Sequence, residues 1–483
     1  MKDTGRITKG LDPKIVGILY GDNLDELIDG EMVYSTQVDR AHLVMLTKEK
    51  IVDKNKVKLL LNEINNLREN EFGPLRGKTP HRGIYLLYED YLIEKLGEDI
   101  GGVLQTARSR NDLNATILKL RLRGHYNSIM MNLLELQKIL IEKSNQFKDV
   151  IMPAYTHFQA AVPITYGHYL AGIASAIDRD IENIIASSKG LQYCPLGAGA
   201  VGGTSFPIDS KLTAKLLGFF YEVENSVDAV ASRDLVLRLL SATSIAGITI
   251  SRLATDYLLW TTSEFNFLSF PDKLVGSSSM MPNKRNIFIL ENIQGKSGFA
   301  LGQFISSSNA MQCKPYTNSI SVGTEGVKSI WKPLEESIAA IILMTNMVEN
   351  ATPNKENMLR KSLDGYTFAT ETANELVRQH GMSFRSAHYL VGKIVKESIE
   401  NKEPFKDAAK RILNESNKNL SFDNFEMERI VMNSRFGGGP GRSSLKILNK
   451  KLIRYKRHFE KDLKYWAKSD KVLEREIKKI CGS

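Results

Sequence analysis

Long stretches in which apolar side chains recur every three or four residues constrain the fold of this 483-residue chain most strongly. The longest runs from Asn111 to Phe147 without a proline, and the stretches 166–186, 226–265 and 287–311 share both features. The stretch 326–348 has the same apolar spacing with a single proline. Apolar positions at that spacing line one face of a helix, and runs of this length are typical of bundle helices. The pattern predicts an all-α protein built around a bundle of long helices.

Two segments of these helices, 235–240 and 245–250, are apolar on more than one face. A helix that is apolar nearly all round must be buried on several sides. In a chain of this size, the simplest way to bury such a helix is to pack the helices of one subunit on those of another. We therefore expect an oligomer.

Breaks in the helical pattern divide the chain into three predicted helical domains. Residues 1–107 form an N-terminal domain, residues 108–360 hold the long-helix bundle, and residues 361–483 form a C-terminal domain with a basic tail. The second boundary follows the segment 351–354, where proline and asparagine favour a turn.

The positive charge of the chain is concentrated in that tail. Residues 446–479 contain 13 Lys and Arg against 5 Asp and Glu, a net charge of +8 out of the +10 of the whole chain, so the rest carries +2. A basic segment can bind nucleic acid. The apolar residues of the tail recur at helical spacing, however, which favours a packed amphipathic helix with a solvated basic face over nucleic-acid binding.

The sequence also argues against several other classes of protein. It has no uninterrupted apolar stretch of about 18 residues that would predict a membrane span, and its N-terminus lacks the apolar core of a signal peptide. Cys194, Cys313 and Cys481 are far apart and have no metal-ligand spacing. We expect a cytoplasmic protein with no membrane partner and no metal site.

The run from Gly276 to Asn286 is the strongest candidate for chemistry. It combines three serines with Lys284, Arg285 and two amides, so its hydroxyl and backbone N–H groups can hold an anion. The helical pattern resumes at Ile287, so the run can lie at a helix N-terminus, where negative charge is also favoured. On composition alone, a flexible Ser/Gly linker is an equally good interpretation.

Three other stretches carry candidate polar side chains. Arg110 and Asn111 lie at the start of a long helix, where Ser109 or Asn111 can be a simple cap, but the Arg110–Asn111 pair can also bind a carboxylate. His157 lies between Pro153 and Pro163, as either a packed core histidine or a site residue. Glu291 lies on the helix after the serine run, where it either faces solvent or orients a histidine.

One motif points to a cofactor only superficially. Residues 197–202 fit G-x-G-x-x-G, a dinucleotide fingerprint that has this meaning only between a strand and a helix. Pro195 precedes the motif and Pro207 follows it closely, which leaves room for neither element. We interpret the segment as a glycine-rich turn that allows close helix packing.

Taken together, these stretches resemble the argininosuccinate lyase branch of the fumarase/aspartase superfamily. The signature loop of that superfamily, G-S-S-x-M-P-x-K-x-N, is matched by residues 277–286, with Ser277 in place of the glycine. Further matches to the branch are residues 108–112, 155–159, 195–197 with 206–209, 258–265 and 384–393. The resemblance extends over residues 33–440.

The resemblance implies a homotetramer with a twenty-helix core and active sites built from three subunits each. It implies a C–N lyase of arginine biosynthesis that needs no cofactor and eliminates fumarate from an N-substituted aspartate, with argininosuccinate as the first-choice substrate. Carried over by motif, Ser278 is the general base on a mobile loop. His157, held by Glu291, assists proton transfer or orients the substrate. The implied substrate-binding residues are Arg110, Asn111, Thr156, Gln159, Lys284, Asn286 and Tyr316.

The chain departs from the family pattern at the ends of the implied site. Gln105 replaces a histidine, Val162 and Ser321 each replace a glutamine, and Thr324 replaces a lysine. Loss of the lysine alone removes a charge-assisted contact of about 1.5–3 kcal/mol. Two alternatives therefore stay open: the same elimination on a different N-succinyl amine, and a non-catalytic, crystallin-like structural protein. The physiological direction of the reaction also stays open.

Overall fold

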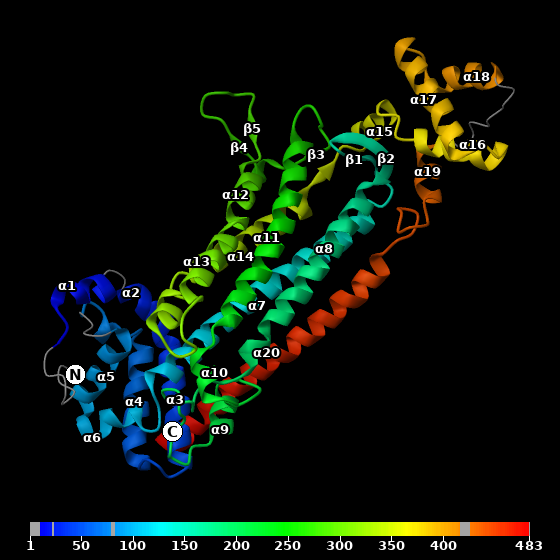
Figure 1. Cartoon of the computed structure of the whole chain (residues 1–483). Coiled ribbons are helices and arrows are strands. Elements are labelled where there is room, and N and C mark those ends of the chain that lie inside the picture. The colour runs from blue at the N-terminus through cyan, green and yellow to red at the C-terminus, as the bar shows by residue number, and fades with distance from the viewer. Residues whose placement is uncertain (1–9, 22–23, 79–82, 416–425, 483) are drawn as a thin grey trace.

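The computed structural model of the chain describes residues 10–21, 24–78, 83–415 and 426–482. Long helices run side by side along one axis, with a group of shorter helices at each end (Figure 1). The prediction of an all-α fold built on a long-helix bundle is confirmed.

At one end of the bundle lies the N-terminal part of the chain. Its helices are α1 (Pro13–Val16), α2 (Leu24–Leu27), α3 (Val33–Lys48), α4 (Lys54–Glu69), α5 (Ile84–Leu96) and α6 (Glu98–Gly101). A buried ion pair closes this part onto the bundle, because Arg108 Nη1 donates to Asp39 at 2.6 Å and Arg108 Nη2 donates to Tyr85 Oη at 2.6 Å. This contact fixes the segment that leads into the first long helix.

The bundle consists of α7 (Arg110–Gln146), α8 (Tyr166–Ser187), α11 (Asp234–Thr261), α12 (Phe288–Ser297), α13 (Phe299–Met311) and α14 (Trp331–Asn350). Two short helices, α9 (Ser210–Leu216) and α10 (Ser226–Ala231), lie on the connection between α8 and α11. The helix expected over 287–311 is interrupted at Gly298, which ends α12. Pro333 lies in the first turn of α14, where its missing N–H has no helical partner to lose.

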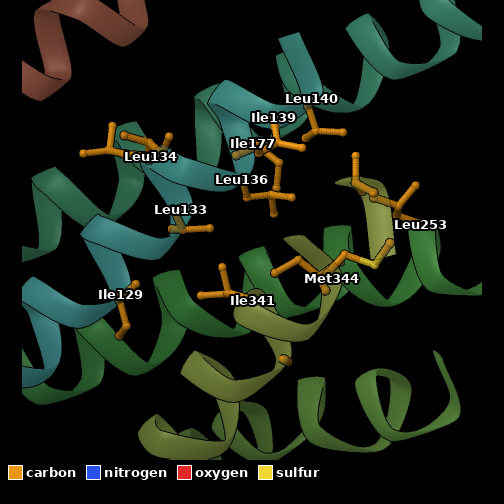
Figure 2. Close-up of a cluster of buried hydrophobic side chains, with 14 of the residues drawn as sticks. Ile129, Leu133, Leu134, Leu136, Ile139, Leu140, Ile177, Leu253, Ile341 and Met344 are labelled. Atoms are coloured by element: carbon orange, nitrogen blue, oxygen red, sulfur yellow. The ribbon is translucent and has the colours of Figure 1, made fainter. Parts of the chain in front are cut away.

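The bundle core consists of aliphatic side chains from four helices (Figure 2). Leu133, Leu136 and Leu140 of α7 face Ile341 and Met344 of α14, and all five are nearly or fully inaccessible to solvent. Replacing one of these leucines by alanine leaves a cavity and costs about 2–5 kcal/mol. The core therefore holds the helices, and whatever they carry at their ends, at fixed positions.

Short strands occur only at loops within the described residues. They are β1 (Ile151–Thr156) with β2 (Gln159–Thr165), β3 (Leu268–Ser269) with β6 (Thr352–Pro353), and β4 (Gly276–Ser277) with β5 (Arg285–Asn286), all antiparallel. The β1–β2 hairpin follows α7, and the β4–β5 hairpin precedes α12. Both lie at the end of the bundle opposite the N-terminal helices (Figure 1).

The C-terminal part forms a small cluster of α16 (Ala369–His380), α17 (Phe384–Glu400) and α18 (Phe405–Glu415) with its own core, flanked by α15 (Lys355–Asp364) and α19 (Met427–Asn433). The basic tail is a single 37-residue helix, α20 (Leu445–Cys481), that returns along the whole bundle (Figure 1). Its apolar residues Leu452 and Phe459 are buried, and Lys451 pairs with the buried Asp178 at 2.5 Å. The tail is therefore docked, as the amphipathic pattern predicted.

One side of the bundle remains apolar and exposed. Ile248 of α11 and Phe299 and Ile305 of α13 are each about half exposed. Among the described helices, α11 is also the one long and apolar enough to cross a membrane, yet 56% of its most apolar window is buried inside the bundle. Core helices of globular proteins have this composition as well, and the exposed side favours a second copy of the chain as its cover.

Candidate active site

The start of α7 is fixed by a network around Asp112. Ser109 is the N-cap residue and forms a capping box with Asp112, whose buried carboxylate accepts N–H bonds from Ser109 and Leu113 at 3.0 Å. It also accepts N–H bonds from Gly197 at 3.1 Å and Gly199 at 3.0 Å. The glycine-rich turn thus wraps a carboxylate of the chain itself, which agrees with the packing interpretation and not with a dinucleotide site.

Asn111, next to this network, is held from two sides. Its Nδ2 donates to the carbonyl of Ala200 at 3.1 Å, and its Oδ1 accepts from Asn318 Nδ2 at 2.8 Å. Close by, Tyr316 Oη donates to Asp228 at 2.5 Å, and this bond raises the pKa of Tyr316 to about 12. Three predicted residues, Arg110, Asn111 and Tyr316, therefore lie at one end of the bundle.

Sequence reasoning missed three polar residues at this end: Asn318, Asp228 and Arg233. Arg233 is buried and donates to the carbonyls of Val230 and Ser232 at 3.0 and 2.7 Å, and burial lowers its pKa to about 10. A signal was present, since Arg233 is a charged residue at the start of a strongly apolar helix. The contact of Asn318 with Asn111 spans 207 positions and follows from no local pattern.

The β1–β2 hairpin presents three predicted site residues at its tip. Thr156 pairs with Gln159, and the two residues between them, His157 and Phe158, have φ values of 51° and 62°. Such a turn normally carries Asn-Gly, so a histidine and an aromatic residue here are strained. All four side chains are exposed, Phe158 at 89%. The core-histidine alternative for His157 is therefore wrong.

The serine run forms the β4–β5 hairpin, in which Gly276 pairs with Asn286. Ser278 Oγ lies at its tip and accepts the backbone N–H groups of Met281 at 3.0 Å and Met280 at 3.3 Å. Lys284 is exposed beside it. The run is thus an ordered hairpin with an internal N–H cradle for the serine oxygen, which goes against the linker interpretation.

The predicted site residues of one chain lie at two ends of the bundle. Ser278 and His157 are at the hairpin end, whereas Asn111 begins α7 at the other end (Figure 1). The 28 residues of α11 alone separate these ends by about 42 Å, at 1.5 Å per residue. Glu291 is exposed on α12, and no hydrogen bond joins it to His157 among the described residues. One chain therefore does not bring these groups together.

The departures from the family pattern are distributed over both ends. Ser321 and Thr324 lie in the π-helix η7 (Ser321–Glu325), next to Asn318. Gln105 is half-buried beside Glu89 in the N-terminal part. Val162 lies on β2 and is exposed.

Comparisons with known proteins give the family. The Lyase family matches residues 48–302, and the family described as Argininosuccinate lyase C-terminal matches residues 366–431. The argininosuccinate lyase of Methanococcus maripaludis is 31% identical over 439 residues, which cover 88% of this chain and 90% of the relative. Argininosuccinate lyase 1 of Shouchella clausii is 33% identical over 395 residues, covering 82% and 79%.

This chain belongs to the argininosuccinate lyase family of the fumarase/aspartase superfamily. It is a carbon–nitrogen lyase, and the prediction of an enzyme is confirmed. Membership of the family indicates an enzyme that acts on a small molecule. The family and the exposed apolar side of α11 and α13 both indicate an oligomer.

Solved structures agree with this assignment. EDDS lyase in complex with formate superposes with a TM-score of 0.85 at 25% identity, over 100% of this chain and 99% of that one. A class II fumarase from Schistosoma mansoni superposes with a TM-score of 0.68 at 16% identity, over 85% and 95%. The second likeness is in fold alone.

Proposed function

We propose that this enzyme eliminates fumarate from argininosuccinate and releases arginine, with Ser278 as the general base. Relatives named argininosuccinate lyase, at 30–34% identity over most of the chain, support the substrate. The observation that carries the base is the pair of N–H groups, from Met280 and Met281, that Ser278 Oγ accepts.

These N–H groups can stabilise the alkoxide that a serine must form in order to act as a base. A serine hydroxyl holds its proton too strongly to act as a base unless the alkoxide is stabilised, and preorganised donors supply that stabilisation without reorganisation during the reaction. The Ser278 alkoxide removes a proton from the carbon next to a succinyl carboxylate. The electron pair moves onto that carboxylate, returns to form the double bond of fumarate, and expels the nitrogen, which leaves protonated.

The remaining residues then bind the substrate or assist the proton transfer. Lys284 and Asn286 lie in the same hairpin as Ser278 and suit the carboxylate that takes up the charge. Arg110, Asn111, Thr156, Gln159 and Tyr316 hold the rest of the substrate. His157, oriented by Glu291 of another subunit, delivers the proton to the leaving nitrogen.

We further propose a cytoplasmic homotetramer in which three subunits contribute to each site. Because the two groups of site residues in one chain are about 42 Å apart, a complete site requires hairpins from neighbouring copies. The tip of β1–β2 is strained and exposed, and the serine hairpin is exposed, so both can reach the site of a neighbouring copy. No groups of His, Cys, Asp and Glu suited to a metal ion occur among the described residues, and the proposed steps need none.

The function is tested by following the ultraviolet absorbance of fumarate when the purified protein is mixed with argininosuccinate. Release of fumarate and arginine in equal amounts supports the proposal. Release of fumarate only from other N-succinyl amines would reassign the leaving amine and keep the elimination. A folded oligomer that releases fumarate from none of them would contradict the enzyme assignment.

A further inference from the structure

A pair of asparagine amides at the Arg110 end has a fixed polarity. Asn318 Nδ2 donates to Asn111 Oδ1 at 2.8 Å, and Asn111 Nδ2 donates to the carbonyl of Ala200 at 3.1 Å. A carbonyl can only accept, and an amide donates through nitrogen alone. If the Asn111 amide turned over, its oxygen would face the Ala200 oxygen and its nitrogen would face the Asn318 nitrogen. The bond to Ala200 would be lost, and the bond to Asn318 would survive only if the Asn318 amide turned over as well.

This arrangement determines what Asn111 can offer a ligand. One of its two N–H groups is used by Ala200, and one lone pair of its oxygen is used by Asn318. The second N–H group remains as a donor. Without Asn318, the Asn111 amide keeps its bond to Ala200 and loses the second of these two anchors.

The backbone at Gly323 lies close to the side-chain amide of Asn318. An added Cβ at Gly323, in the π-helix η7, would lie 3.1 Å from Asn318 Oδ1 and 3.4 Å from the Arg233 guanidinium. Asn318 is half-buried between this turn and α7. The absence of a side chain at position 323 therefore lets Asn318 reach Asn111, and an alanine there displaces the amide oxygen by a few tenths of an ångström.

We propose that Asn318 is a positioning residue that, together with the Ala200 carbonyl, holds the Asn111 amide in place, so that Asn111 presents its second N–H group to an acceptor oxygen of the substrate. The role rests on the proposed function, in which Asn111 binds substrate. It explains how a segment with no charged side chain from Tyr316 to Thr324 still contributes to the site. Asn318 acts through Asn111 and does not itself contact the reacting atoms.

The test compares four single variants by steady-state kinetics on argininosuccinate. Asn318→Ala raises KM about tenfold with kcat changed less than twofold, since a binding hydrogen bond is lost equally in ground and transition states. Asn318→Asp places a carboxylate, which can only accept, against Asn111 Oδ1, so the two oxygens repel each other and KM rises further. Gly323→Ala raises KM about threefold. Thr317→Ala, an exposed neighbour in the same loop, is the matched control and changes neither constant by more than twofold.

A double-mutant cycle separates positioning from a general structural effect. In an Asn111→Ala background, Asn318→Ala adds less than a twofold change, because the residue it positions is gone. Full additivity, or Asn318→Ala kinetics equal to those of Thr317→Ala, would overturn the role.

The proposed function and this inference fail in different ways. If the wild-type protein releases no fumarate from argininosuccinate, the proposed substrate fails. A crystal structure of Asn318→Ala then still decides the positioning role. The role predicts that the Asn111 side chain, held by Ala200 alone, is displaced or takes up more than one position, and an Asn111 side chain unmoved from its wild-type place would refute it.

Discussion

Both ends of the bundle carry predicted site residues, but the two ends are built in opposite ways. At the Arg110 end, side chains are tied down within the chain, as shown by the four N–H bonds to Asp112 and the two bonds of Asn111. At the hairpin end, His157 and Lys284 are exposed, and Phe158 is held at a positive φ while 89% accessible. The polar groups of the first end find partners within one chain, whereas the side chains at the hairpin tips lie exposed.

The difference teaches how a site can be divided between copies of one chain. Preorganised groups that bind substrate are most effective when their own positions are locked. Groups that enter a neighbouring copy must instead project from the surface, and their side chains find partners only after assembly. On this account, substitutions at the hairpin end affect catalysis with little effect on folding, whereas substitutions at the Arg110 end affect both.

The largest effect is expected at the hairpin end. Ser278→Ala removes the proposed base and lowers kcat by about a thousandfold or more, in the range found when a general base or nucleophile is deleted. Because the hairpin tip is exposed, the melting temperature and oligomer size remain those of the wild type. The fumarate assay and calorimetry measure the two effects. The control is Ser277→Ala, one residue away with its side chain exposed, and equal losses in both variants would refute a special role for Ser278.

A smaller effect, on stability as well as on activity, is expected at the Arg110 end. Asp112→Asn places an amide nitrogen against backbone N–H donors that now bond a carboxylate, and lowers the free energy of unfolding by about 3 kcal/mol. Asp234→Asn is the matched control, an exposed first-turn acid of α11 that pairs with the exposed Arg238, and costs less than about 0.5 kcal/mol. Urea denaturation at fixed protein concentration measures both. Equal losses would show that the Asp112 network does not stabilise this end.

The smallest predicted effect is a pH dependence of the Arg110 end. His42 is buried, donates through Nε2 to the carbonyl of Thr106 at 2.9 Å, and has its pKa lowered to about 3 by burial and by Arg108. In the unfolded chain its pKa is near 6.5, so the unfolded state binds a proton that the folded state does not. Stability is therefore fully present above pH 6.5 and falls by about 1 kcal/mol between pH 6.5 and 5.5.

The His42 effect is isolated by comparison with His42→Gln. Glutamine can donate to Thr106 but does not titrate, so the loss of stability over that pH interval is smaller in the variant than in the wild type. Parallel urea curves at the two pH values, for both proteins, provide the measurement. The same pH dependence in both would mean that His42 is not the titrating group.

The sequence predicted the elements that depend on local pattern. The predicted stretches 111–147 and 166–186 match α7 and α8 to within one residue at every boundary. The cap at Ser109 depends on side chains within three positions of it, which a local pattern contains. The β1–β2 hairpin was missed because its strands carry two prolines and its turn has neither asparagine nor glycine. Asn318, Asp228 and Arg233 were missed because they matter through contacts between segments that are far apart in the sequence. The spacing of apolar residues does not predict such contacts.

The most direct test of a site divided between copies is complementation between two inactive variants. Ser278→Ala is defective at the hairpin end and Asn111→Ala at the other, and the two are mixed in equal amounts, dissociated in urea and reassembled. If each site draws these residues from different subunits, about a quarter of the sites in random oligomers contain both intact groups. The account predicts fumarate release at about a quarter of the reassembled wild-type rate. No recovery, with oligomers of wild-type size, would show that both groups act within one chain and would contradict it.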